Sequence, residues 1–212
     1  MEDCVTSEYF LVGDTICNSW QKTESKRKQG IMTDNKQELF PITDEKGNIL
    51  GKITRGEAHG GGKVLHPVVH LHVFNSHGDL FLQQRPIWKD IQPGKWDTAV
   101  GGHINYEECL DHNGNQLPTL AGCIEKALAR EAREELGISG FTPHFLGTYV
   151  FEGVREREQV FSFSTVYDKE IIPDKEELAG GRFWSEKEIL DAIGKGLFTP
   201  NFEDEYIRVV KR

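Results

Sequence analysis

One stretch with helical periodicity, from Thr119 to Leu136, constrains this chain more than any other segment. At about 100° per residue its apolar side chains gather on one stripe, which predicts the face that packs against a sheet. The apolar members of the stripe are Leu120, Ile124, Ala127 and Leu128. Gly137 follows the last turn, and glycine at this position is typical of a helix end. We therefore expect one long helix over 119–136.

Three carboxylates, Glu131, Glu134 and Glu135, continue the same stripe. Carboxylates this close on an inward face would repel each other and take up protons, at a cost of several kcal/mol, unless a cation joins them. Oxygen ligands of this kind favour hard ions such as Mg²⁺ or Mn²⁺. The alternative is an exposed helix end whose glutamates form i,i+4 pairs, for example Arg130 with Glu134.

Short β-type segments separated by turns make up most of the remaining chain. The predicted strands cover 40–43, 49–53, 66–74, 80–85, 96–100, 145–151 and 159–166. Further helices are predicted from Ser185, with Glu188 completing a capping box, to about Ile193, and over 202–210. Because strands and helices do not alternate, the pattern favours a mixed α+β (α/β) fold with a mixed sheet over a doubly wound parallel one.

The first 36 residues differ in character from the rest. The segment 22–30 is polar, lacks periodicity and contains the basic cluster 26–28, which predicts an N-terminal extension or linker (1–36) before a domain at 37–212. No signal peptide or membrane-spanning run is recognisable, and the four cysteines form no Cys-x-x-Cys pair. We therefore expect a cytoplasmic protein with free thiols and no membrane partner.

The charge balance restricts the partners of the chain. Its 34 acidic and 25 basic residues give a net charge of −9, and a field of that sign repels a nucleic-acid backbone. A small phosphorylated ligand is still compatible with this charge, because a bound divalent cation reverses the local sign. The sequence leaves open whether the chain acts alone or as a homodimer.

The segment 130–138 resembles the C-terminal half of the Nudix box: Arg-Glu, an apolar residue, any residue, Glu-Glu, any residue, Gly and an apolar residue. Gly102 and Glu108 fit the first half, which is Gly, five residues and Glu. The family then has seven residues before the arginine, whereas this chain has 21, so it resembles the family with a 14-residue insertion before the helix. The resemblance runs from about Glu38 to the end and implies a Nudix-type α/β/α sandwich.

The resemblance also implies an activity and a set of site residues. Nudix hydrolases cleave the diphosphate linkage of a nucleoside diphosphate joined to another moiety, with Mg²⁺ (or Mn²⁺) bound to the helix carboxylates. The insertion puts the role of Glu108 in question, whereas the helix half of the box is intact. The residues so assigned are Glu131, Glu134 and Arg130 as catalytic groups, Glu131, Glu134, Glu135 and the Gly102 carbonyl as metal ligands, and Arg85, Lys89 and His103 as substrate contacts.

An alternative follows from a second resemblance, to the isopentenyl-diphosphate isomerase-like branch of the superfamily. The residues that carry it are Leu82–Arg85, Pro93–Asp97, His59, His66 and His103. Three imidazoles could bind a transition metal in an isomerase-like site. The isomerase needs a cysteine where this chain has Gly101, and a Glu-x-Glu pair for which the alignment places Gln159 on one position. Hydrolysis is therefore favoured over isomerisation.

Two further classes remain as alternatives. A catalytically silent, nucleotide-binding Nudix domain would have a damaged box, and the helix half of this box is undamaged. A structural domain with an acidic helix would show no Mg²⁺-dependent activity. On the predicted strand 66–74, His70 and His72 alternate on one face, and we expect them to line a pocket or the edge of the core rather than to bind metal.

Overall fold

The computed structural model describes residues 35–89 and 91–211, which belong to one structural unit of the chain. The predicted extension at 1–36 lies outside these residues except for its last two positions, so its boundary stays a prediction. In the described part of the chain, no helix is long and apolar enough to cross a membrane.

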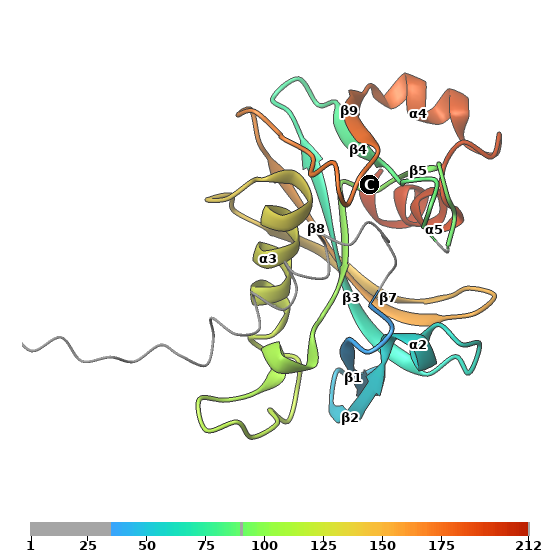
Figure 1. Ribbon diagram of the computed structural model, residues 1–212. Helices are drawn as coiled ribbons and strands as arrows, with labels where there is room; N and C mark the ends of the chain where they lie inside the picture. The colour runs from blue at the N-terminus through green and yellow to red at the C-terminus, as the bar shows by residue number, and fades with distance from the viewer. Residues whose placement is uncertain (1–34, 90, 212) are drawn as a thin grey trace, which may run out of the picture. The chain divides into compact units, whose positions relative to one another are not determined.

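A mixed sheet of seven strands forms the centre of the fold (Figure 1). Its strands are β3 (Leu65–Phe74), β4 (Leu80–Gln84), β5 (Trp96–Asp97), β6 (Val100–His103), β7 (His144–Glu152), β8 (Arg157–Val166) and β9 (Gly180–Trp184). They are ordered β5-β4-β3-β8-β7, with β6 also paired to β3 and β9 to β4. The β3 and β8 strands run parallel, while the other pairs are antiparallel. The predicted mixed sheet is confirmed.

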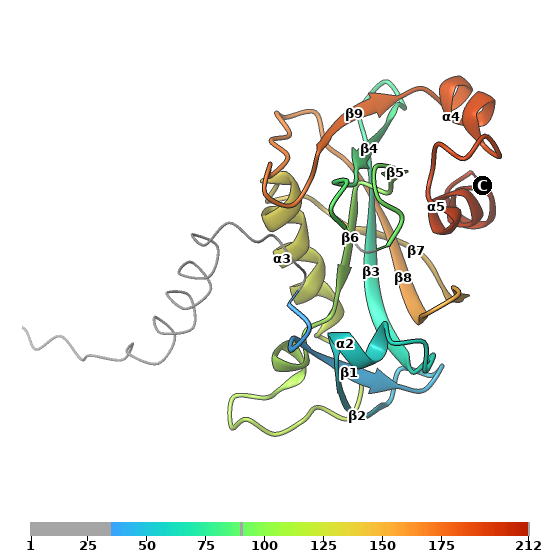
Figure 2. The ribbon, with the colours of Figure 1, turned by 45° about the vertical axis from the view of Figure 1, so that its right-hand side comes forward.

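Helices cover both faces of this sheet (Figure 2). The covering elements are α3 (Ile124–Leu136) on one face, and α4 (Glu186–Ala192), α5 (Pro200–Glu205) and the π-helical turn η2 (Tyr206–Val210) on the other. One apolar cluster joins α3 to β3 and β6, and a second joins β4 to α4, α5 and η2. The arrangement confirms the predicted α/β/α sandwich.

The central strand β3 explains how polar groups come to lie inside the sandwich. Successive side chains on a strand point to opposite faces. Val69, Leu71 and Val73 belong to the apolar cluster with α3, whereas His70 and His72 face α5 and contact its last residue. The β3 strand therefore has one apolar face and one face on which histidines alternate.

The helix α3 begins at Ile124, five residues later than predicted. Thr119 forms an isolated β-bridge with Asn48, and the N–H of Leu120 donates to the carbonyl of Gly47 at 3.0 Å. Gly122 then adopts a φ of 85°, a left-handed conformation that helical residues do not have. These residues are held by the neighbouring hairpin, so they cannot form the first turn. The predicted end is confirmed, since Gly137 caps the helix with a φ of 65°.

The other elements match the predicted pattern with a few differences. The strands β1 (Leu39–Thr43) and β2 (Ile49–Thr54) form a separate hairpin, and Ser185 and Glu188 form the predicted capping box of α4. The one-turn helix α2 (Arg55–Ala58) and the strand β9 had no clear signal, because each is too short to show periodicity. The predicted strand 96–100 is two strands, and β6 continues through both glycines, Gly101 and Gly102.

The 14-residue insertion forms its own loop between the 3₁₀ helix η1 (Tyr106–Cys109) and α3. The Oδ1 atom of Asp111 accepts hydrogen bonds from the N–H groups of Asn113 and Asn115 and so fixes a tight turn. Cys109 and Cys123, at the two ends of this loop, are buried free thiols as expected. The loop therefore lengthens the chain without separating η1 from α3.

Candidate active site

Arg130 joins the two halves of the predicted box in space. Its Nε donates to Glu108 Oε1 at 2.8 Å, and its Nη1 donates to Glu131 Oε1 at 2.8 Å and to Glu134 Oε2 at 3.0 Å. Its Nη2 donates to the backbone carbonyl of His103 at 2.8 Å. The insertion therefore leaves Glu108 beside the helix carboxylates, and Arg130 contacts them through charge-assisted hydrogen bonds.

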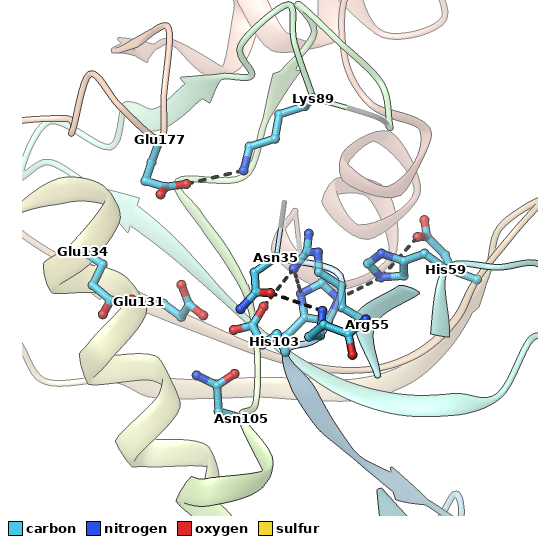
Figure 3. A network of polar contacts seen from close by, with 12 residues as sticks. Asn35, Arg55, His59, Lys89, His103, Asn105, Glu131, Glu134 and Glu177 are labelled. Carbon is cyan, nitrogen blue, oxygen red and sulfur yellow. Dashed lines mark hydrogen bonds and ion pairs between the residues drawn. The ribbon is translucent and has the colours of Figure 1, made fainter. Parts of the chain in front are cut away.

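Glu131 lies directly against Gly102. A Cβ atom built on Gly102 would stand 2.0 Å from the Cδ atom of Glu131, so only glycine leaves room for this carboxylate. Burial raises the pKa of Glu131 to about 7, although the Arg130 guanidinium opposes the rise. In Figure 3 the side chain of Glu131 extends from α3 toward the strand that carries His103. This packing positions one carboxylate at the edge of β6.

Glu135 is the second carboxylate at this edge. Its Oε2 accepts hydrogen bonds from the N–H of Gly101 at 3.2 Å and from Nε2 of Gln83 at 3.3 Å. Burial and the nearby charge of Glu131 raise the pKa of Glu135 well above its ordinary value. Two mutually repelling carboxylates, with one arginine on only one of them, form a donor set that fits a hard divalent cation.

Glu134 has a different environment. Its side chain is 47% exposed and forms the i,i+4 pair with Arg130, which is the arrangement weighed as the alternative to an inward position. Of the three carboxylates on the predicted stripe, Glu131 and Glu135 therefore face inward, while Glu134 lies at the solvent-facing edge of the site. It is still within one helical turn of Glu131.

A second group of possible ligands lies beside the first. It consists of His59, His66, His103 and Glu158, whose ligand atoms all lie within 4.8 Å of one another. The Nε2 atoms of His59 and His103 are 3.1 Å apart, and Nε2 of His103 is 3.7 Å from Glu158 Oε1. We call these four residues the histidine cluster. Its members come from the C-cap of α2 and from the strands β3, β6 and β8.

The chemistry of the histidine cluster fits a divalent metal. Nδ1 of His66 contacts the carbonyl of Val64 at 2.9 Å, which leaves its buried Nε2 with no hydrogen-bond partner in the described part of the chain. Burial lowers the pKa of His66, and burial with the Arg55 charge lowers that of His103 well below its usual range. Neutral imidazoles with one carboxylate suit a transition metal.

The structure corrects the predicted Glu-x-Glu pair, which is Glu156 and Glu158 at the start of β8. Glu156 and Glu158 both face the histidines, with Glu156 Oε2 3.8 Å from Nε2 of His59. Gln159, which the alignment placed on one of the two positions, bonds instead to Thr43 and to the carbonyl of Glu45. Side chains two residues apart share one face of a strand, so Glu156 and Glu158 point the same way. Gln159 is next to Glu158 and therefore points to the opposite face.

The predicted substrate cations already make contacts within the protein. Nη1 of Arg85 is 3.1 Å from Asp97, and its Nε and Nη2 donate to the carbonyl of Ile91. Lys89 pairs with Glu177 at 3.4 Å, and Figure 3 shows these two side chains pointing toward each other. His103 belongs to the histidine cluster. Their contacts with substrate therefore stay predictions.

Sequence reasoning missed two contributors to this region. Glu205 contacts both His70 and His72, and no pattern in the sequence relates residues this far apart. Arg55 places its Nη1 3.5 Å from Nδ1 of His103. The alternation of His70 and His72 on β3 does indicate that some polar group covers this face, because buried imidazoles need hydrogen bonds. It does not indicate which residue that is.

Comparison with known proteins agrees with the fold and the box. A family model described as the NUDIX domain matches residues 64–202. The chain is 31% identical over 146 residues to an uncharacterized Nudix hydrolase of Pseudomonas aeruginosa, covering 69% of this chain and 78% of the relative. It is 28% identical over 170 residues to an isopentenyl-diphosphate Delta-isomerase of Streptomyces coelicolor, covering 77% of this chain and 79% of that enzyme.

Solved structures show the same fold. The crystal structure of DR0079 from Deinococcus radiodurans matches with a TM-score of 0.63 and 20% identity, covering 81% of this chain and 98% of that protein. A MutT protein from Methanosarcina mazei matches with a TM-score of 0.53 and 21% identity, covering 69% of this chain and 94% of that protein. The family match, the relatives and the intact helix half of the box together show that the chain belongs to the Nudix family and is a Nudix hydrolase.

Proposed function

We propose that this Nudix hydrolase cleaves the diphosphate linkage of a small molecule of the nucleoside diphosphate-X type, with Mg²⁺ or Mn²⁺ at the helix carboxylates. One observation carries the proposal: Glu131 and Glu135 both lie at the edge of β6, where burial raises the pKa of each and the charge of Glu131 adds to the rise at Glu135. A divalent cation beside them removes this penalty.

Different residues of the site would position the metal ligands and assist the attacking water. Arg130 and Gly102 fix the position of Glu131, and the N–H of Gly101 with Gln83 fixes that of Glu135. Bound Mg²⁺ would offset phosphoryl charge and lower the pKa of an attacking water. Glu134, at the solvent-facing edge of the site, would accept a proton from that water. The net negative charge of the protein makes the reaction depend on the metal, because substrate and site are both anionic.

A panel of diphosphates tests the proposal. Release of phosphate or nucleoside monophosphate is measured for nucleotide sugars, dinucleoside polyphosphates, nucleoside triphosphates and coenzyme A, with Mg²⁺, with Mn²⁺ and with a chelator. We expect turnover of at least one class, lost with the chelator. Absence of metal-dependent turnover across the whole panel would reject the hydrolase proposal.

The histidine cluster favours one second candidate, an isopentenyl-diphosphate isomerase-like activity. Three imidazoles and Glu158 offer the site for a second metal, and Glu156 lies beside them. Gly101 stands where that chemistry needs a proton-transferring cysteine, and glycine has no group that can transfer a proton. Isopentenyl diphosphate therefore belongs in the panel with an isomer-specific assay, and its conversion to the allylic isomer would favour this second candidate.

A further inference from the structure

His70 is a buried imidazole whose two nitrogens have different surroundings. Its Nδ1 is 2.7 Å from Oε2 of Glu205, whose own side chain is fully buried. The other oxygen of Glu205 is 3.1 Å from Nε2 of His72, and Nδ1 of His72 is 3.2 Å from the hydroxyl of Thr98. The ring of His70 is therefore fixed from the α5 side by the hydrogen bond between its Nδ1 and Glu205.

The opposite nitrogen of His70 lies beside Gly101 of β6. His70 pairs with Gly101 across β3 and β6, and a Cβ atom built on Gly101 would lie 3.7 Å from Nε2 of His70. The N–H of Gly101 donates to Glu135, so the residue beside this nitrogen also contacts a predicted metal ligand. Among the described residues, Nε2 of His70 has no polar partner within hydrogen-bond distance.

The surroundings of His70 favour its positively charged form. Burial alone would lower its pKa, but the carboxylates of Glu205, Glu158 and Asp97 raise the pKa of His70 to about 9. At neutral pH both ring nitrogens then carry protons, and in the part of the chain that the structure describes only Nδ1 has an acceptor. Arg85 and Lys89 are paired with carboxylates, whereas His70 keeps one donor for an anion.

We propose that His70 is a substrate-binding residue, whose Nε2–H donates to a phosphate oxygen of the diphosphate, and that Glu205 is its positioning residue. The inference rests on the proposed function, because it identifies a phosphate contact in that same site. Gly101, which has no side chain, places nothing over this nitrogen from β6. A cysteine or alanine at this position would cover it.

Two variants test this assignment from opposite sides. His70→Gln removes the cation, while Gly101→Ala leaves His70 intact and places a methyl group over its Nε2. The added carbon meets nothing closer than 3.4 Å, from Thr98, so the fold should accept it. The matched control is His77→Gln, since His77 lies in an exposed turn. The probe is inorganic pyrophosphate with Mg²⁺, whose dissociation constant is measured by calorimetry beside KM and kcat for the panel substrate.

We expect both variants to weaken pyrophosphate binding and raise KM at least about tenfold, the loss typical of a hydrogen bond to a charged group. His77→Gln should match the wild type. Glu205→Gln should also raise KM. If Glu205 had only a structural role, this variant would lower stability and leave KM unchanged. If His70→Gln fails to fold, Gly101→Ala decides alone. Wild-type turnover together with unchanged KM and pyrophosphate binding in Gly101→Ala would overturn the inference, whereas absence of wild-type turnover would reject the proposed function.

Discussion

The guanidinium of Arg130 donates from Nη2 to the backbone carbonyl of His103 at 2.8 Å. The same guanidinium holds Glu108 and Glu131, while the imidazole of His103 belongs to the histidine cluster. One arginine thus fixes the helix carboxylates to the strand that separates them from a second group of possible metal ligands. The two sites share β6, so a shift of this strand would disturb both.

Replacing Arg130 should impair catalysis more than folding. Arg130→Lys keeps the charge but loses the planar fork that contacts Glu108, Glu131 and the carbonyl of His103 together. We expect kcat to fall about 10- to 100-fold, the usual effect of losing a partner that orients metal ligands. Steady-state kinetics at saturating Mg²⁺ measure the change. Arg133→Lys, on the exposed face of the same helix, is the control, and equal kinetics for the two variants would contradict the role of Arg130.

A side chain at Gly102 should displace Glu131. In Gly102→Ala the new Cβ would meet the Cδ atom of Glu131 at 2.0 Å, so the carboxylate or the strand must move, at a cost of about 1–3 kcal/mol. We expect a lower free energy of unfolding in urea and a higher Mg²⁺ concentration for half-maximal activity. Gly51→Ala serves as the control, because a Cβ there meets nothing within 4 Å. A Gly102→Ala protein with wild-type metal dependence would argue against this packing.

The histidine cluster should retain a transition metal independently of the helix carboxylates. After dialysis against a trace of Mn²⁺ or Zn²⁺, we expect elemental analysis to find one tightly held ion in the wild type and in Glu135→Gln. His66→Gln should lose it, because the buried Nε2 of His66 is a ligand atom with no hydrogen-bond partner within 35–89 and 91–211. His77→Gln should keep it. Metal retained in His66→Gln and lost in Glu135→Gln would place the ion at the other site.

Stability without metal should fall as pH rises. The pKa of Glu131 is raised to about 7 and that of Glu158 to about 8, in each case chiefly by burial. The folded protein therefore still holds protons that the unfolded chain releases near pH 4.5. The stability that these two carboxyl groups contribute is complete below that pH. It is lost between about pH 4.5 and 8, at roughly 1 kcal/mol of unfolding free energy per pH unit per group. Urea unfolding in chelator at pH 7 and 8.5 measures it, because the lowered pKa values of His66 and His103 change stability in the opposite direction only below about pH 6.5. Added Mg²⁺ should offset the loss, and stability that rises with pH in chelator would contradict the arrangement.

The sequence predicts those parts of the site that lie within one local pattern. Glu131, Glu135 and Gly137 share one helix, and their spacing alone predicts an inward carboxylate face with a glycine stop. Glu134 is exposed although it lies on the same stripe. Periodicity predicts the direction of a side chain around the helix axis, but it does not predict how far the neighbouring segments cover that side chain. Its position could be resolved only by knowing that Arg130 occupies the side next to it.

Contacts between distant segments explain what the sequence does not predict. Glu108 contacts Arg130 because the insertion forms a tight turn at Asp111 and so keeps its two ends close together. The spacing along the chain does not predict this contact. Glu205 lies beside His70 only because α5 packs on the face of the sheet opposite α3. The start of α3 was predicted too early because Thr119 pairs with another hairpin, and such pairing overrides local helix propensity.

The central claim is that Glu135 holds a divalent cation required for hydrolysis, and the most direct measurement compares Glu135→Gln with Glu125→Gln. Both remove one negative charge from the same helix, but Glu125 is exposed in its first turn, away from β6. With the best substrate of the panel, we expect kcat of Glu135→Gln at saturating Mg²⁺ to fall at least about 100-fold. Glu125→Gln should match the wild type. Unchanged Mg²⁺-dependent turnover in Glu135→Gln would contradict the assignment of this site.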